Sequence, residues 1–171
     1  ESRVQEALPK QEALRDLPQI RWHFIGRLQP NKVRAVVKAF SWIHSIDSLA
    51  LAQRTSRIAL EEQQRPTALL QVQLGDDPAK GGWEIDALKD AWPELQMLEG
   101  LQISGLMTMA PMGVAAEDRA ELFRECRDLA DALGLQHCSM GMSGDWREAS
   151  AAGATWVRLG SVLFGPRQSP T

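Results

Sequence analysis

Two stretches near the C-terminal end of the sequence combine glycine and serine in a way that suits anion binding. They are Ser139-Met-Gly-Met-Ser-Gly-Asp145 and Trp156-Val-Arg-Leu-Gly-Ser161. Glycine lets a backbone approach an anion closely, consecutive N–H groups form a concave nest, and serine hydroxyls add donors. Each stretch follows a short apolar run, which predicts a strand that ends in a loop. We interpret the two loops as neighbours that hold a phosphate; two ordinary tight turns are the alternative.

The arginine of the second stretch is the strongest single candidate for ligand binding. Arg158 lies on an apolar strand, two residues before Gly160. In parallel α/β barrels a phosphate commonly binds the loops after the last two strands, and a guanidinium in the barrel mouth needs an acceptor there. The alternative for Arg158 is a salt bridge to a core carboxylate.

The rest of the chain alternates strands with helices. The apolar patterns predict strands at 20–25, 42–46, 67–74, 102–109, 135–138 and 156–159, and helices at 3–13, 32–40, 47–63, 83–92, 116–133 and 146–152. Continuous apolar strands that alternate with helices indicate a parallel sheet covered by helices. In the first helix, Val4, Ala7 and Leu8 are expected to face inward, and Pro9 is expected to kink or break the helix.

Length and composition limit the class of protein. A chain of 171 residues is one domain's worth, and its net charge of −3 does not indicate a nucleic-acid partner. No apolar run approaches the roughly 20 residues of a membrane span, and the first residues do not resemble a signal peptide. Cys126 and Cys138 lack metal-binding spacing, so we expect them to be reduced and structural in a cytoplasmic protein.

Five blocks of the sequence resemble one known family. The segments 139–145 and 157–165 resemble the closing motifs of the YggS/PROSC family of pyridoxal phosphate (PLP) homeostasis proteins, and the segments 22–32, 45–47 and 105–109 resemble further blocks in the same order. The resemblance implies a (β/α)8 TIM-type barrel of the alanine racemase N-terminal type, here incomplete with about six strands. It also implies that residues 1–171 are a single PLP-binding domain.

The resemblance implies a function as well as a fold. PLP would be bound for intracellular homeostasis, as buffering or delivery of the cofactor, without a turnover reaction. Ser139, the backbone of Met140, Gly160 and Ser161 would bind the phosphate, and Arg158 would face the pyridine nitrogen. A guanidinium cannot give that nitrogen a proton, so PLP becomes a weaker electron sink for carbanion chemistry. Enzymes that accept PLP are possible partners, and the intact family is monomeric.

The beginning of the sequence departs from the family pattern. The family's first strand ends in a Val-Ser-Lys-Thr-like motif whose lysine forms the Schiff base with PLP, and no segment here matches it. The segment Glu1–Glu6 instead resembles the residues after the family's second strand, with Ser2 in place of Asn. We therefore expect the first two strands to be missing, PLP binding to be non-covalent or weakened, and the exposed sheet edges to favour self-association.

Several alternatives stay open at this point. A racemase-like enzyme fragment would turn over an amino acid, although the chain has no tyrosine to serve as the second base. A regulatory module that has lost PLP would bind no ligand. Lys80 in its glycine-rich loop is a conceivable aldehyde acceptor, but a solvated lysine is favoured. His23 could line the barrel mouth, and a hydrogen-bonded core histidine is the favoured alternative. Asn31 and Asp47 are predicted to cap helices.

Overall fold

The six predicted strands form one parallel sheet in the structure. The computed structural model describes residues 1–75 and 81–165. Its strands are β1 His23–Phe24, β2 Trp42–Ile46, β3 Thr67–Gln71, β4 Gln102–Met107, β5 His137–Met142 and β6 Trp156–Arg158. They pair in chain order, each parallel to its neighbour. This confirms the predicted alternation and sheet type, since parallel neighbours need a crossover between them.

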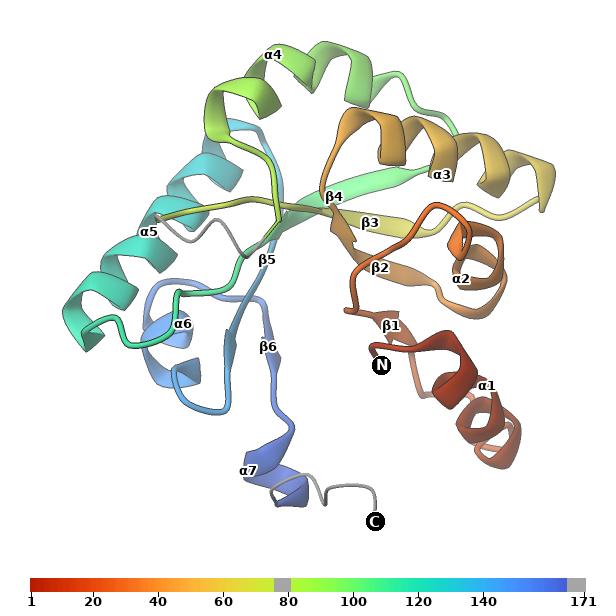
Figure 1. The fold of residues 1–171 in the computed structure, drawn as a ribbon, viewed down its shortest axis with the longest axis horizontal. Coiled ribbons are helices and arrows are strands. Elements are labelled where there is room, and N and C mark those ends of the chain that lie inside the picture. The colour runs from red at the N-terminus through yellow and green to blue at the C-terminus, as the bar shows by residue number, and fades with distance from the viewer. Residues whose placement is uncertain (76–80, 166–171) are drawn as a thin grey trace.

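Most of the helices cover the outer face of this sheet, whereas the last one follows the edge strand on the open side and buries no side chain (Figure 1). The described residues form seven helices. They are α1 Val4–Ala13, α2 Val33–Ala39, α3 Leu49–Glu61, α4 Ile85–Gln96, α5 Ala116–Ala132, α6 Trp146–Ala151 and α7 Ser161–Phe164. The sheet curves strongly, so that its edge strands β1 and β6 both face the open side of a half-barrel (Figure 1). Rings from the two edges meet inside the curve, where the centroids of His23 and Trp156 are 4.8 Å apart.

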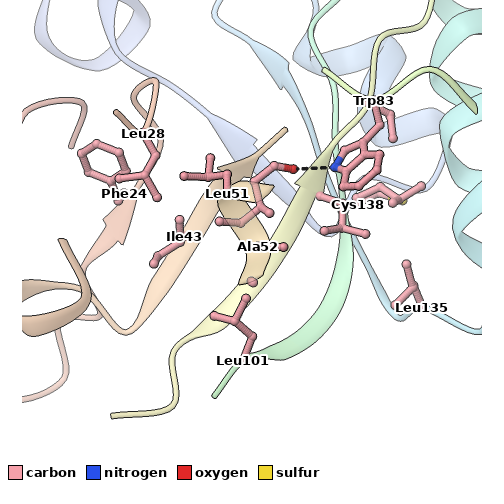
Figure 2. Close-up of a cluster of buried hydrophobic side chains, with 14 of the residues drawn as sticks. Phe24, Leu28, Ile43, Leu51, Ala52, Trp83, Leu101, Leu135 and Cys138 are labelled. Atoms are coloured by element: carbon pink, nitrogen blue, oxygen red, sulfur yellow. Dashed lines mark hydrogen bonds between the residues drawn. The ribbon is translucent and has the colours of Figure 1, made fainter. Parts of the chain in front are cut away.

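The main hydrophobic core lies between the sheet and its helices. Outward-facing side chains of the strands, such as Ile43, pack against helix residues, such as Leu51 and Ala52 (Figure 2). Burial of each large apolar side chain contributes roughly 1.5–3 kcal/mol. The indole N–H of Trp83 donates to the Ile46 carbonyl oxygen at 3.0 Å, so this ring enters the core with its polar atom satisfied.

Helical spacing over 116–133 predicts an inward face of Leu122, Phe123, Cys126, Leu129 and Leu133, and the first four are confirmed, while Leu133 at the C-cap is only partly buried. The residues Leu122, Phe123, Cys126 and Leu129 of α5 are all buried. Cys126 and Cys138 are buried and unpaired, as expected from their spacing. No helix among the described residues has both the length and the apolar character needed to cross a membrane.

Two prolines do not end the helices that contain them. The helix α1 continues through Pro9, and α4 continues through Pro93 to Gln96, beyond its predicted end. Each proline removes only one helical N–H and lies on an exposed face. In α4 the next turn buries Leu95, which is 1% exposed and favours continuation of the helix.

Other predictions of helix faces and boundaries were also wrong. The side chain of Leu8 is 50% exposed, because Val4 and Ala7 fill the buried face of α1 without it. Strand β1 contains only two residues instead of the six predicted. The helix α7 follows β6 where a loop was expected. The strand β5 extends through Met142 into the glycine and serine stretch that was predicted to be loop.

Substitution of Gly105 in β4 tests how closely β4 packs against β5. An added Cβ at Gly105 would lie 2.2 Å from the backbone oxygen of His137. Backbone atoms cannot move aside as a flexible side chain does, so we expect Gly105→Ala to reduce the free energy of unfolding by roughly 1–3 kcal/mol. Urea denaturation measures the change.

Gly144→Ala is the matched control for this substitution. An added Cβ at Gly144 meets no atom within 4 Å, and its φ does not require glycine. We expect this variant to stay within about 0.5 kcal/mol of the parent. Equal effects of the two substitutions would contradict the steric argument.

Candidate functional site

A cavity of about 830 Å³ lies between the two edges of the curved sheet. Its lining includes side chains from both sides and from the strand ends between them: His23, His44, Met109, Met142, Arg158 and Gly160. It therefore brings the C-terminal glycine and serine stretches next to residues more than 100 positions earlier in the chain.

A layer of aromatic rings lies inside the curve of the sheet, and two of its members, His23 and Trp156, line the cavity. Trp42 and Trp156 are the first residues of β2 and β6, and His137 is the first residue of β5. Ring centroids of His23 and Trp42 are 5.0 Å apart in a stacked arrangement, and those of Trp42 and Trp156 are 5.3 Å apart. These rings occupy the interior of the curve at the amino-terminal ends of β2, β5 and β6.

Oxygen acceptors on Ser139 and Thr108 hold the guanidinium of Arg158 in place. Its Nη1 donates to the backbone oxygen of Ser139 at 2.7 Å and to Ser139 Oγ at 2.9 Å, and its Nη2 donates to the backbone oxygen of Thr108 at 2.9 Å. These bonds leave one Nη2 hydrogen and the Nε hydrogen for other acceptors. Within the described residues Arg158 forms no ion pair, so the salt-bridge alternative does not hold there.

The guanidinium of Arg158 keeps its charge despite its surroundings. Burial lowers the pKa of Arg158 to about 10, and the Asp145 carboxylate acts in the opposite direction. The group is therefore protonated at neutral pH. A charged donor with two free hydrogens beside a cavity favours ligands with lone pairs or negative charge.

Two histidines continue the polar contacts from Ser139 across the barrel. His44 Nδ1 lies 2.9 Å from Ser139 Oγ, and His44 Nε2 lies 2.9 Å from His23 Nδ1. His44 is 2% exposed. Burial lowers the pKa of His44 to about 3 and that of His23 to about 4, with smaller contributions from neighbouring positive groups. Both rings are neutral at pH 7.

The two glycine and serine loops meet above β5 and β6. Ser143 Oγ accepts hydrogen bonds from the backbone N–H groups of Gly160 at 3.3 Å and Val162 at 3.4 Å. The backbone N–H of Met142 donates to Asp145 Oδ1 at 2.6 Å, which fixes the shape of the first loop. Backbone N–H groups of the second loop thus converge on one oxygen, as they would on a phosphate oxygen.

Gly141 positions this first loop. Its φ is +89°, in the left-handed region that favours glycine, and an added Cβ would lie 2.6 Å from the Cβ of Ala149. The close approach of α6 to β5 at this point turns the chain toward β6. A larger residue would push Ser143 away from the N–H groups of the second loop.

The structure distributes the predicted site residues over two places. Gly160 and Ser161 lie at the start of α7 beside Ser143. Ser139 is fully buried with its hydroxyl bonded to Arg158 and His44, and Met140 is fully buried within the core. Their assignment as cofactor-binding residues stays a prediction. Ser143 was not among the predicted site residues, although it is one of the three serines in the two glycine and serine stretches.

The remaining candidates lie away from this cavity or outside the described residues. Asp47 accepts a hydrogen bond from Ser48 Oγ at 3.2 Å and lines a separate groove. The predicted caps do not form, because the residues before α2 and α3 are Lys32 and Ser48 and neither makes a side-chain cap bond. Lys80 falls outside the described residues.

Comparisons with known proteins agree on one family. The sequence matches the family described as alanine racemase, N-terminal domain, over residues 1–168. A pyridoxal phosphate homeostasis protein from Synechocystis sp. (strain ATCC 27184 / PCC 6803 / Kazusa) is 52% identical over 98% of this chain and 79% of its own length. Another from Aquifex aeolicus (strain VF5) is 41% identical over 98% of this chain and 76% of its own length.

Solved structures give the same result. PipY from Synechococcus elongatus PCC7942, solved with PLP bound, has a TM-score of 0.91 and 47% identity over 96% of this chain and 79% of its own. An alanine racemase from Clostridium difficile 630 has a TM-score of 0.74 and 17% identity over 98% of this chain and 44% of its own. The second likeness shows the fold alone.

The lowered pKa values of His23 and His44 predict acid sensitivity. In the unfolded chain both histidines bind protons near their ordinary pKa of 6.5, whereas the folded protein binds them only near pH 4 and pH 3. Between these values the two rings together take up about two protons on unfolding, so the stability that depends on their neutral form, complete above pH 7, falls as pH falls. Urea unfolding at a series of pH values from 7.5 to 5 gives the slope.

His44→Gln isolates one of the two groups. This variant should lose about one proton from the slope of unfolding free energy against pH, whatever its absolute stability, because one titrating group is gone. A parent protein whose unfolding free energy stays constant between pH 7.5 and 5 would contradict the neutral, buried state of these rings.

Proposed function

The chain belongs to the family of pyridoxal phosphate homeostasis proteins, which have the alanine racemase N-terminal fold, and from this premise we propose that it binds pyridoxal 5′-phosphate and buffers or delivers it. The observation that carries the proposal is the pairing of a charged donor with a nest of N–H groups. Arg158 and Gly160 line one cavity, and the backbone N–H of Gly160 donates to Ser143 Oγ.

The residues of this cavity fit the chemistry of the cofactor. Its phosphate would bind beside Ser143 Oγ, accepting the hydroxyl hydrogen and hydrogen bonds from the N–H groups of Gly160 and Val162, which now converge on that oxygen. The free hydrogens of Arg158 would face the pyridine nitrogen, as the family resemblance implies. The cavity volume of about 830 Å³ accommodates a ring of this size with its substituents.

Binding without turnover is the second part of the proposal. When bound, PLP supplies an electron sink whose strength depends on protonation of its ring nitrogen. Arg158, with a pKa of about 10, offers a hydrogen bond but no proton at neutral pH, which keeps that sink weak. The two histidines that line the cavity have pKa values of about 4 and about 3, far from the value near 7 that suits a general acid or base.

The proposal has further elements that concern the whole protein. It treats residues 1–171 as part of one PLP-binding barrel domain, which the single sheet and its continuous core support. It places the protein in the cytoplasm, in keeping with two unpaired cysteines. Enzymes that accept PLP are its proposed partners.

Substitution of Ser143 tests where the phosphate binds. We expect the full chain to bind pyridoxal 5′-phosphate, measured by absorbance and by quenching of tryptophan fluorescence, since Trp22 and Trp156 line the cavity. Ser143→Ala should weaken this binding about tenfold or more, because a hydrogen bond to a charged group contributes roughly 1.5–3 kcal/mol. Affinity for pyridoxal, which has no phosphate, should not change.

Two comparisons make this experiment decisive. Ser150→Ala, on the exposed face of α6, should leave both affinities at the parental value. Failure of the parent chain to bind pyridoxal 5′-phosphate would contradict the proposed function. Loss of pyridoxal binding in Ser143→Ala to the same degree as the phosphate ester would place the phosphate elsewhere.

A further inference from the structure

A row of hydrogen bonds runs from Arg158 through Ser139 and His44 to His23. Every donor hydrogen in this row finds an acceptor in only one of the two possible donor-to-acceptor directions. A guanidinium can donate but not accept, so Ser139 Oγ accepts from Arg158 Nη1 at 2.9 Å. The hydroxyl then has its own hydrogen to place. Among the described residues its other side-chain neighbour is His44 Nδ1 at 2.9 Å, so the hydroxyl donates to that nitrogen.

This donation decides the protonation of the next two rings. A neutral imidazole carries its proton on one nitrogen and accepts at the other. Since His44 accepts at Nδ1, its proton is on Nε2 and is donated to His23 Nδ1 at 2.9 Å. His23 therefore also carries its proton on Nε2.

The opposite direction leaves a buried donor without an acceptor. If His23 donated to His44 and His44 donated to Ser139 Oγ, that oxygen would accept two hydrogen bonds while its own hydrogen had no partner among the described residues. Ser139 is 0% exposed, so water cannot replace the missing acceptor. A buried, unsatisfied hydroxyl is disfavoured.

Protonation of the two rings is also disfavoured. Burial lowers the pKa of both histidines, and the positive charge of Arg158 lowers that of His44 further. Because Arg158 always stays protonated and can only donate, it sets the donor-to-acceptor order of the hydrogen bonds that follow.

We propose that Arg158, acting through Ser139 and the positioning residue His44, fixes His23 as its Nε2–H tautomer and so gives the cavity a neutral N–H donor for an acceptor atom of the ligand. His23 lines the cavity, and its Nε2 has no hydrogen-bond partner among the described residues. This nitrogen is also not one of the fully buried unpartnered atoms, so it remains accessible.

The layer of aromatic rings holds the donor in place. The ring of His23 stacks on Trp42 at 12° between planes and also contacts Trp156 at 4.8 Å between centroids. A ring held by these two contacts and by the bond from His44 presents Nε2–H in one direction. Such an N–H group donates a hydrogen bond to an oxygen or nitrogen lone pair, and it cannot accept a hydrogen bond from an ammonium group. The ligand atom at this position must therefore be an acceptor. The identity of the ligand as pyridoxal 5′-phosphate rests on the proposed function, but the tautomer does not.

Nuclear magnetic resonance of the full chain labelled with ¹⁵N-histidine tests the tautomer. The sequence has three histidines, so single His→Gln variants assign the spectrum. At pH 7, without ligand, we expect His23 and His44 both to be neutral with the proton on Nε2. A proton on Nδ1 of either ring, or a doubly protonated ring, in the parent protein would overturn the proposal.

Ser139→Ala tests the role of the hydroxyl in the same spectrum. Without its donor, His44 should change from one tautomer to a mixture, and His23 should follow, while His137 keeps its parental signals as the internal control. Unchanged tautomers of His23 and His44 in a folded Ser139→Ala protein would show that Arg158 does not set the direction.

Titration with pyridoxal 5′-phosphate separates the donor role from the proposed function. We expect the Nε2 signal of His23 to shift with saturation. Binding seen by tryptophan fluorescence with no shift at His23 would overturn the donor role and leave the proposed function intact. Absence of binding would contradict the proposed function, and with it the donor role toward this ligand, while the ligand-free spectrum still decides the tautomer.

Discussion

The burial of one guanidinium constrains the whole interior of this half-barrel. Arg158 brings a full positive charge into a site where desolvation lowers its pKa to about 10, and the described residues provide no ion pair for it. It is stabilised instead by three oxygen acceptors on Ser139 and Thr108. Thr108 in turn donates from Oγ1 to the Val72 carbonyl oxygen at 3.2 Å. A single cation thus connects the carboxyl ends of β3, β4, β5 and β6, because each of its bonds requires the strands to stay in register.

The two histidines extend the hydrogen bonds of Arg158 across the interior without adding charge. His44 and His23 are neutral because burial penalises their protonated forms, and Arg158 opposes a second positive charge nearby. The interior around Arg158 is therefore polar and hydrogen-bonded, and its charge is permanent. Such a site can bind and orient an anionic, aromatic ligand, and it offers little for proton transfer at neutral pH.

The division of the barrel into two halves explains where a ligand fits. Aromatic rings from the first residues of β2, β5 and β6 occupy the interior of the curve at the amino-terminal ends of these strands, and apolar core packing closes the outer face. The cavity lies between the edge strands β1 and β6, and the two loops meet beside it at Ser143 and Gly160. The fold shared with the alanine racemase N-terminal domain supplies this division, whereas the side chains of this chain determine what the open half can hold.

The sequence alone determined the features that depend on local pattern. Alternating apolar strands and helices established six parallel strands, helical spacing established the buried face of α5, and the glycine and serine stretches identified the two loops and Arg158. Tertiary structure decided which groups meet. His44 and Ser139 are 95 residues apart in sequence, and no periodicity links them. Packing also exposed Leu8 and carried α4 past Pro93, because contacts between elements outweigh the local preference of one residue. Local pattern fixes which faces are apolar, but hydrogen bonds between distant strands form only once the curvature of the sheet brings those strands together.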